Sequence, residues 1–233
     1  MSPIDVLAVG AHPDDAEIGM GGTLAKLADQ GYRTALICLT KAELSSNGTV
    51  EERQKEAANA AKVLGAERMQ LAFPDRQLSV YRPDCIAALV KVVREYRPKI
   101  VFAPNKEDRH PDHGHCSEIV KEAVFSAGIR RYLPESGTAA YRPTALYYYQ
   151  INGVIKPDFV VDISGYVEQK RKALSCYKSQ FNKNEQSAAT PLNTGYLQAV
   201  EGRERLLGNE AGVTYAEGFL SDRPLLMSNL IGE

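Results

Sequence analysis

Residues 4–15, IDVLAVGAHPDD, join a short apolar run to a turn that carries His12, Asp14 and Asp15. Residues 100–113, IVFAPNKEDRHPDH, repeat that design much later in the chain. In each stretch the apolar run predicts a buried β-strand, and a His-Pro-Asp triplet follows its end. The chain has four histidines, and all except His115 lie in these two motifs. This distribution suggests one site that is assembled from two distant segments.

Around these motifs, apolar runs alternate with helical patterns four times in the first half of the chain. Strands are expected at residues 4–9, 34–39, 68–72 and 100–103, and helices at 23–30, 50–64, 83–96 and 114–127. The second helix has the clearest limits, because Thr49 and Glu52 form a capping box before it and Gly65 follows it. Strict alternation of strand and helix predicts a parallel, doubly wound sheet.

The rhythm changes after about residue 130. Strands are expected at 145–151 and 159–163 and a helix at 167–177, whereas the polar tail from Phe181 onward shows no clear pattern. No repeat or linker interrupts the sequence. We therefore expect one domain over residues 1–233, of the α/β class. It would be a Rossmann-like, doubly wound, mostly parallel sheet flanked by helices, with additional C-terminal strands and helix.

Composition excludes several classes of function. The 233 residues are 44% hydrophobic, enough for a packed core, and the formal net charge is −1. No long basic stretch favours nucleic acid, and no apolar run is long enough for a bilayer. The N-terminus lacks the pattern of a signal peptide, and the four cysteines are scattered without a CxxC pair. These features predict a cytoplasmic protein with reduced thiols and no membrane or nucleic-acid partner.

Topology predicts that the two motifs meet. In a doubly wound sheet the first and fourth strands are neighbours, and ligands bind at their carboxyl ends. A hydrolytic zinc site needs three protein ligands and an open position for water. His12, one of Asp14 or Asp15, and one of His110 or His113 could supply the ligands. The spare carboxylate could act as base, the spare histidine could stabilise an oxyanion, and Asp112 could orient that histidine. Spacing leaves these assignments open.

Two other classes of function fit part of the pattern. A non-heme iron oxygenase also uses two histidines and one carboxylate, but it would leave the second aspartate of the first motif without a task. A metal-binding or sugar-binding protein without catalysis explains a ligand set but not the surplus acids and histidine. Oxygen consumption would favour the first alternative, and release of a hydrolysis product would exclude the second.

Several segments together resemble one known family. The motifs AHPDDAE at 11–17 and HPDH at 110–113 are similar to the signature of the PIG-L-like, or LmbE-like, zinc N-deacetylases. Further segments at 40–49, 73–76 and 177–181 are most similar to the deacetylases of bacillithiol biosynthesis, which act on N-acetylglucosaminyl-malate. Related enzymes act on N-acetylglucosamine or chito-oligosaccharides, which form the alternative substrates. The resemblance implies a small N-acetylated amino sugar as the substrate.

The resemblance also implies a role for each residue of the two motifs. His12, Asp15 and His113 would bind Zn²⁺, with Fe²⁺ as a possible occupant in vivo. Asp14 would be the general base and later the acid for the departing amine. A protonated His110 would stabilise the oxyanion, and Asp112 would orient His110.

The resemblance extends to substrate binding and assembly. Glu43, Arg53 and Asp75 would line the pocket for the sugar and its aglycone. Arg109 is a candidate for binding the carboxylates of malate, because a guanidinium matches a carboxylate in a bidentate fork. Similar proteins form homo-oligomers, which implies a hexamer here.

Overall fold

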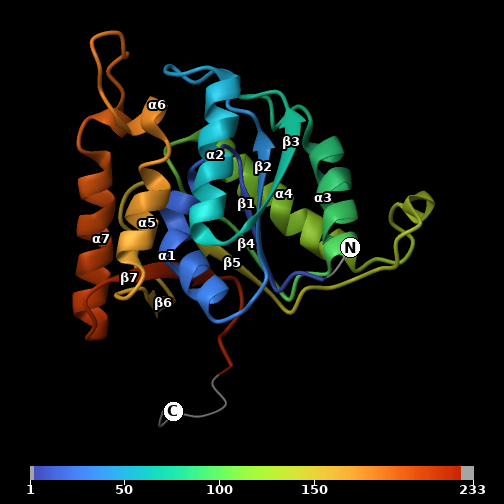
Figure 1. Cartoon of the computed structure of the whole chain (residues 1–233). Coiled ribbons are helices and arrows are strands. Elements are labelled where there is room, and N and C mark those ends of the chain that lie inside the picture. The colour runs from blue at the N-terminus through green and yellow to red at the C-terminus, as the bar shows by residue number, and fades with distance from the viewer. Residues whose placement is uncertain (1–2, 227–233) are drawn as a thin grey trace.

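The computed structural model describes residues 3–226 and shows a seven-stranded sheet between two layers of helices (Figure 1). The strands are β1 (Val6–Gly10), β2 (Thr34–Thr40), β3 (Glu67–Phe73), β4 (Ile100–Pro104), β5 (Ala145–Tyr149), β6 (Phe159–Asp162) and β7 (Ala216–Ser221). The helices are α1 (Asp15–Asp29), α2 (Val50–Leu64), α3 (Arg82–Tyr96), α4 (Pro111–Ala127), α5 (Val167–Leu174), α6 (Lys178–Phe181) and α7 (Tyr196–Ala211).

The strand order is β3-β2-β1-β4-β5-β7-β6. The first five strands are parallel, whereas β7 pairs antiparallel with both β5 and β6. This confirms the predicted α/β class, with a mostly parallel sheet and additional C-terminal strands. Because β1 pairs with both β2 and β4, the two His-Pro-Asp motifs follow adjacent strands, as predicted.

Helices cover both faces of the sheet. In Figure 1, α3 and α4 lie on one side, and α1, α2, α5 and α7 lie on the other. The strand β1 is buried from both directions: Leu7 and Val9 join the core beneath α3 and α4, while Val6 and Ala8 join the core beneath α1 and α2. Such two-sided burial explains why its sequence is continuously apolar rather than alternating.

Two helices begin earlier than predicted. Helix α1 begins at Asp15 rather than Thr23, and α4 begins at Pro111 rather than Gly114. The glycines that suggested a loop before Thr23 lie inside α1, and Gly19 is needed there. A Cβ on Gly19 would lie 2.1 Å from the ring of Tyr149, so only glycine allows this approach of helix and sheet.

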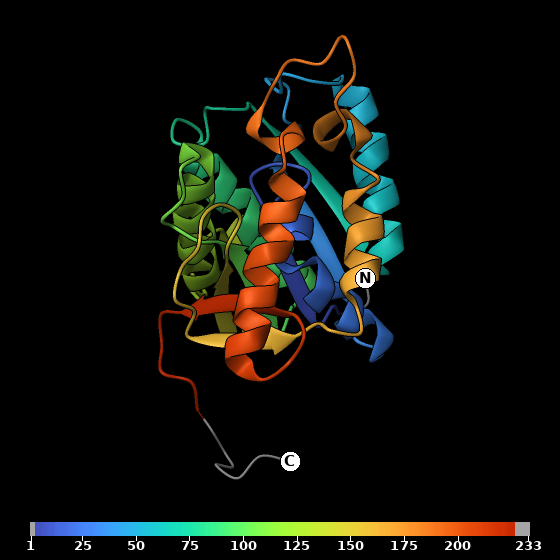
Figure 2. The same cartoon turned by 90° about the vertical axis from the view of Figure 1, so that its left-hand side faces the viewer.

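The polar tail contains elements that the sequence did not reveal. Helix α7 and strand β7 both lie beyond Phe181, and β7 is inserted between β5 and β6. Figure 2 shows α7 in front of the sheet, with the segment before it rising toward the carboxyl ends of the parallel strands.

The predicted capping box of α2 is present, with Gly65 left-handed at its end. Within residues 3–226 no helix is both long and apolar enough to cross a membrane.

Candidate functional site

A cavity of about 370 Å³ lies at the carboxyl ends of the parallel strands. The loops after all five of these strands contribute to its wall, and α2 adds Arg53. Such a crevice is where doubly wound sheets bind ligands. The lining comes from residues His12, Asp14, Asp15, Ile18, Ala42, Leu44, Ser45, Ser46, Arg53, Asp75, Arg76, Arg109, His110, His113, Ile151, Asn152, Gln180, Thr190, Pro191, Leu192 and Tyr196.

The structure brings the three predicted metal ligands together. Asp15 Oδ2 accepts hydrogen bonds from the backbone N–H groups of Ala11 and His12, at 2.8 and 3.0 Å. Its other oxygen, Oδ1, lies 3.2 Å from His113 Nε2, and His12 Nδ1 lies 3.7 Å from Oδ2. All three residues are buried. The backbone bonds orient the carboxylate and leave Oδ1 facing the histidine of the second motif.

His113 is oriented by a residue to which the sequence assigned no role. Its Nδ1 lies 2.9 Å from Asp108 Oδ1. Asp108 also accepts hydrogen bonds from the backbone and side-chain N–H groups of Asn152, in the loop after β5. A carboxylate on the far nitrogen is the usual support of a metal-binding histidine, because it fixes the ring and leaves Nε2 free. Its position in the DRHPDH motif was the available signal.

A second pair of carboxylates faces His12. Its Nε2 lies 3.1 Å from Asp75 Oδ1 and 3.6 Å from Asp112 Oδ2. Although burial disfavours a charged imidazole, the carboxylates around it outweigh burial and raise the pKa of His12. The same balance raises the pKa of His113 to about 9. The negative charge of the surrounding carboxylates therefore favours a positive charge at this place.

The donor set of this cluster fits a metal ion, and the cluster could bind one. Imidazole nitrogens and carboxylate oxygens are ligands of Zn²⁺ and of similar divalent ions. Nitrogens of His12, His110 and His113 lie within 4.8 Å of one another, and so do ligand atoms of His12, Asp75 and Asp112. Neither group is the predicted set of His12, Asp15 and His113, so that set stays a prediction.

Asp14 lies at the start of α1 in a left-handed conformation, with φ 98° and ψ −22°. Asp14 is 4% exposed and lines the cavity. Burial raises the pKa of Asp14 to about 7, against the opposing charge of Arg53. Arg53 Nη2 donates to Asp14 Oδ2 at 2.9 Å and to the Pro13 carbonyl at 2.8 Å. Asp14 is therefore a carboxyl group that can take up and release a proton near neutral pH.

The structure corrects two expectations about His110. The backbone N–H of Asp112 donates to His110 Nδ1 at 3.3 Å, whereas the Asp112 carboxylate accepts from the backbone of Arg76 and faces His12. Asp112 thus orients His110 through its backbone, not through its carboxylate. An N–H donor on Nδ1 opposes protonation there, and burial lowers the pKa of His110 to about 4. This low pKa favours a neutral His110 with its proton on Nε2 over the protonated form that the sequence predicts.

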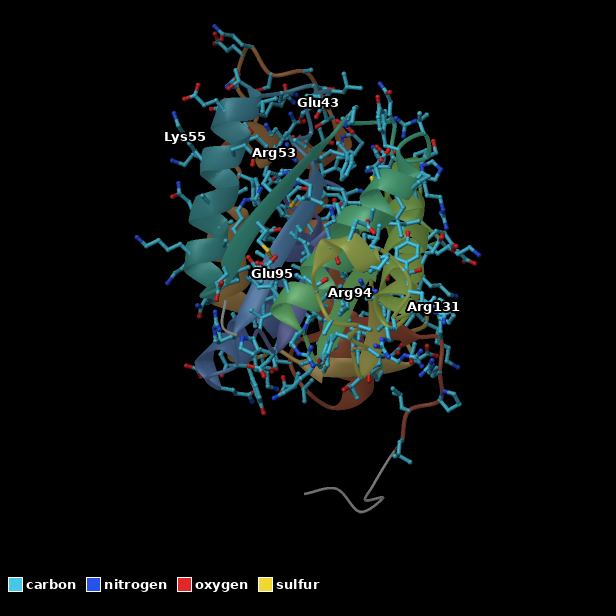
Figure 3. All side chains as sticks on the ribbon, turned by 90° about the vertical axis from the view of Figure 1, so that its right-hand side faces the viewer. Glu43, Arg53, Lys55, Arg94, Glu95 and Arg131 are labelled. Atoms are coloured by element: carbon cyan, nitrogen blue, oxygen red, sulfur yellow. The ribbon has the colours of Figure 1, made fainter. Side chains whose placement is uncertain are left out.

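The substrate-binding candidates divide into two groups. Arg53, Asp75 and Arg109 line the cavity, and Arg53 is buried against Asp14 rather than solvated. Glu43 is outside the lining, and its carboxylate accepts from the backbone N–H of Asp75 at 2.6 Å. Figure 3 shows Arg53 on the inner side of α2, with Glu43 near the upper end of the molecule. Glu43 therefore supports Asp75 and does not line the pocket.

Several other residues near the site were given no role from the sequence. Glu17 is buried and accepts a hydrogen bond from the Tyr177 hydroxyl at 2.6 Å. Arg76, Gln180 and Tyr196 line the cavity although none of them was given a role from the sequence. Arg76 and Gln180 lie in segments 73–76 and 177–181, which carried the family resemblance, whereas Tyr196 belongs to the tail without a readable pattern, so only folding brings Tyr196 to the site.

Comparisons with known proteins agree with this geometry. The model of one protein family, PIG-L: GlcNAc-PI de-N-acetylase, matches residues 7–124, which include both His-Pro-Asp motifs. The chain belongs to the PIG-L family. This confirms the resemblance that the sequence indicated. The matched residues span half of the chain, from β1 into α4.

Three relatives extend the match over most of the chain. The diacetylchitobiose deacetylase of Thermococcus kodakarensis is 31% identical over 224 residues, which are 91% of this chain and 81% of the relative. The probable N-acetyl-alpha-D-glucosaminyl L-malate deacetylase 2 of Bacillus cereus is 28% identical, over 75% of this chain and 83% of the relative. The 4-oxalmesaconate hydratase of Pseudomonas putida is 26% identical, over 96% and 91%.

Two solved structures share the fold. A conserved protein of Thermus thermophilus superposes with a TM-score of 0.88 and 37% identity, over 97% of this chain and 98% of that one. The N,N'-diacetylchitobiose deacetylase of Pyrococcus horikoshii, complexed with an inhibitor, superposes with a TM-score of 0.82 and 28% identity, over 92% and 82%. These matches include the C-terminal elements beyond the region of the family model.

The charge of Arg53 should set the pH dependence of the enzyme. Because Arg53 lowers the pKa of Asp14, Arg53→Met should raise that pKa and shift the acid limb of kcat/KM to higher pH. Arg53→Lys keeps the charge, so its limb should stay closer to that of the wild type. Lys55→Met is the control, because Lys55 lies on the outer side of α2 (Figure 3) and, among residues 3–226, forms an ion pair with Glu51 alone. An unshifted limb in Arg53→Met would contradict this role.

Proposed function

We propose that this chain is a metal-dependent N-deacetylase that hydrolyses the acetamide of an N-acetylglucosamine derivative. One observation carries the proposal: a buried Asp14, held by Arg53, lines the same cavity as the His12, Asp15 and His113 cluster. Hydrolysis of an amide needs a base for water beside a group that stabilises the developing oxyanion. The cavity is also within the size range of small-molecule sites.

The residues of the chain divide the reaction among them. Zn²⁺, held by His12, Asp15 and His113 in this proposal, would acidify water and polarise the acetamide carbonyl. Asp14 accepts the proton of the attacking water, whose oxygen bonds to the carbonyl carbon. The neutral His110 donates its Nε2 proton as a hydrogen bond to the carbonyl oxygen as negative charge develops there. Asp14 then returns the proton to the nitrogen as the C–N bond breaks, giving acetate and a free amine.

For the substrate we propose N-acetylglucosaminyl-malate. Two guanidinium groups support a carboxylate-bearing aglycone, because Arg76 and Arg109 both line the cavity. Arg109 is exposed and forms no ion pair within the described part of the chain. The malate deacetylase of Bacillus cereus supports this choice, whereas the Thermococcus kodakarensis relative favours chito-oligosaccharides as the alternative. A homo-hexameric state and a cytoplasmic location remain predictions.

A panel of substrates tests the aglycone. Wild-type enzyme and Arg109→Met should be assayed with N-acetylglucosaminyl-malate, N-acetylglucosamine and N,N'-diacetylchitobiose. The malate conjugate should have the highest kcat/KM, and Arg109→Met should lower that value by about 10-fold while leaving the neutral sugars unchanged. Equal kcat/KM for the malate conjugate and free N-acetylglucosamine would refute the pathway assignment. It would leave the deacetylation chemistry standing.

The hydratase of Pseudomonas putida supports a second candidate, addition of water to a carbon–carbon double bond of an unsaturated acid. The same base and cation-favouring cluster could serve that reaction. The two activities differ in their products, because hydration releases no acetate. Loss of the ultraviolet absorbance of an unsaturated dicarboxylate, without any acetate from the sugars, would favour the hydratase.

A further inference from the structure

Helix α1 is broken behind the candidate site. Met20 has φ −150° and ψ 24°, which are not helical, so α1 consists of two short helical segments. In an unbroken helix the N–H of Gly22 would bond to the carbonyl of Ile18. A break of this kind needs partners for the polar groups on both of its sides, since buried backbone groups are costly when unpaired.

Two side chains from the C-terminal half supply those partners. Glu217 on β7 accepts from the backbone N–H groups of Gly22 and Thr23, at 2.9 and 2.7 Å, with one carboxylate oxygen for each. Lys170 on α5 donates to the carbonyl of Ile18 at 2.7 Å. Glu217 thus caps the second segment of α1, and Lys170 caps the end of the first.

These residues form a buried charged cluster with Glu204 of α7. Lys170 Nζ lies 2.5 Å from carboxylate oxygens of both Glu204 and Glu217, and no side chain in the cluster is more than 4% exposed. Glu204 shares the cluster but is hydrogen-bonded to Lys170 alone among the described residues. None of the three lines the cavity. A buried charged cluster seldom makes a protein more stable than apolar packing of the same volume would. Stability alone therefore does not account for this cluster, and its contacts with α1 suggest a role in placing that helix.

The first segment of α1 carries the candidate chemistry. Asp15 is its first residue and Asp14 immediately precedes it, so the position of this short segment sets where both carboxylates lie. The helix has little freedom to shift elsewhere, because a Cβ on Gly22 would lie 2.8 Å from Ile163, as one on Gly19 would meet Tyr149. Figure 1 shows α5 and β7 beside α1, and both elements lie beyond residues 7–124, the region that the family model matches.

We propose that Glu217, held in place by Lys170, is a positioning residue for the metal and base carboxylates. Its two hydrogen bonds set the break in α1, and the break sets the place of Asp15 opposite His113. The C-terminal elements thereby act on the site although they contribute no ligand. This inference rests on the proposed function for the role given to the carboxylates.

The test compares two changes within the same cluster. Glu217→Gln and Glu204→Gln each remove one negative charge beside Lys170, but only Glu217 bonds to α1. For each variant the Zn²⁺ dissociation constant of the metal-free protein is measured by competition with a chromophoric chelator, together with Tm, kcat and KM. Glu217→Gln should weaken Zn²⁺ binding and lower kcat by about 10-fold each, with KM unchanged. Glu204→Gln should keep the wild-type Zn²⁺ affinity, even if its Tm falls as far as that of Glu217→Gln.

Equal Zn²⁺ affinities for the two variants would overturn the proposal and make the cluster purely structural. If Glu217→Gln does not fold, Glu217→Asp replaces it, because aspartate keeps the charge beside Lys170 but is one methylene too short to reach both N–H groups. The same loss of affinity is expected for it, and wild-type affinity would equally refute the proposal. Zn²⁺ binding is measured without substrate, so the comparison of the two variants does not depend on deacetylation. Absence of deacetylation would refute the proposed function, and the Zn²⁺ affinities would still decide whether Glu217 positions the carboxylates.

Discussion

Replacing Asp14 with asparagine should lower kcat by about 10²-fold or more while the protein keeps its metal. Asparagine has nearly the same shape, and its amide oxygen can still accept the hydrogen bond that Arg53 donates to Asp14. It cannot take up the proton of water at neutral pH, so the loss should fall on kcat. Steady-state kinetics and the metal content of the purified variant measure the two quantities.

Glu17→Gln is a matched control for this change. Glu17 lies in the first segment of α1, is buried like Asp14 and is hydrogen-bonded to Tyr177, but it does not line the cavity. The variant also loses one buried carboxyl group, so any general effect of that loss appears in it. A kcat near that of the wild type is expected for Glu17→Gln. Near-normal turnover in Asp14→Asn would remove Asp14 from the role of base.

Replacing His113 with alanine should abolish tight metal binding and lower kcat by on the order of 10³-fold or more. His113 is buried, its Nε2 faces Asp15, and Asp108 holds its other nitrogen. Metal analysis after dialysis and the kcat of the same sample test both parts of the prediction.

His115→Ala controls for the removal of a histidine from α4. The side chain of His115 is 43% exposed, and it lies outside the cavity. Its removal should change neither metal content nor kcat. Added metal should also raise the Tm of the wild type but not that of His113→Ala, because a ligand stabilises only the state that binds it. Full metal content in His113→Ala would contradict the proposed ligand set.

Much of the fold could be predicted because its signals are local. Continuous apolar runs marked β1, β2 and β4, and the capping box of Thr49 and Glu52 marked α2. The start of helix α1 was predicted too far along the chain, because glycines are typical of loops. Here Gly19 and Gly22 are needed because Tyr149 and Ile163 approach the helix closely. Strand β7 was missed because its pairing with β5 and β6 is set by the whole sheet, not by its own short sequence.

The candidate site was predictable in its members but not in its internal geometry. Strand order brings His12 and His113 together, so the two motifs were enough to find the cluster. No pattern in the sequence could show that the backbone of Asp112, and not its carboxylate, reaches His110. The same holds for Arg53 and Asp14, which are far apart in sequence and meet only because α2 packs beside the turn after β1.

The most direct test of metal-dependent N-deacetylation is a count of both products. Metal-loaded enzyme, chelated enzyme and chelated enzyme with Zn²⁺ restored should be incubated with N-acetylglucosaminyl-malate and with N,N'-diacetylchitobiose, and acetate and free amine measured in each. We expect equal amounts of acetate and amine from at least one substrate, loss of both on chelation, and recovery with Zn²⁺. Absence of acetate from both substrates, or release that survives complete removal of the metal, would contradict the proposed chemistry.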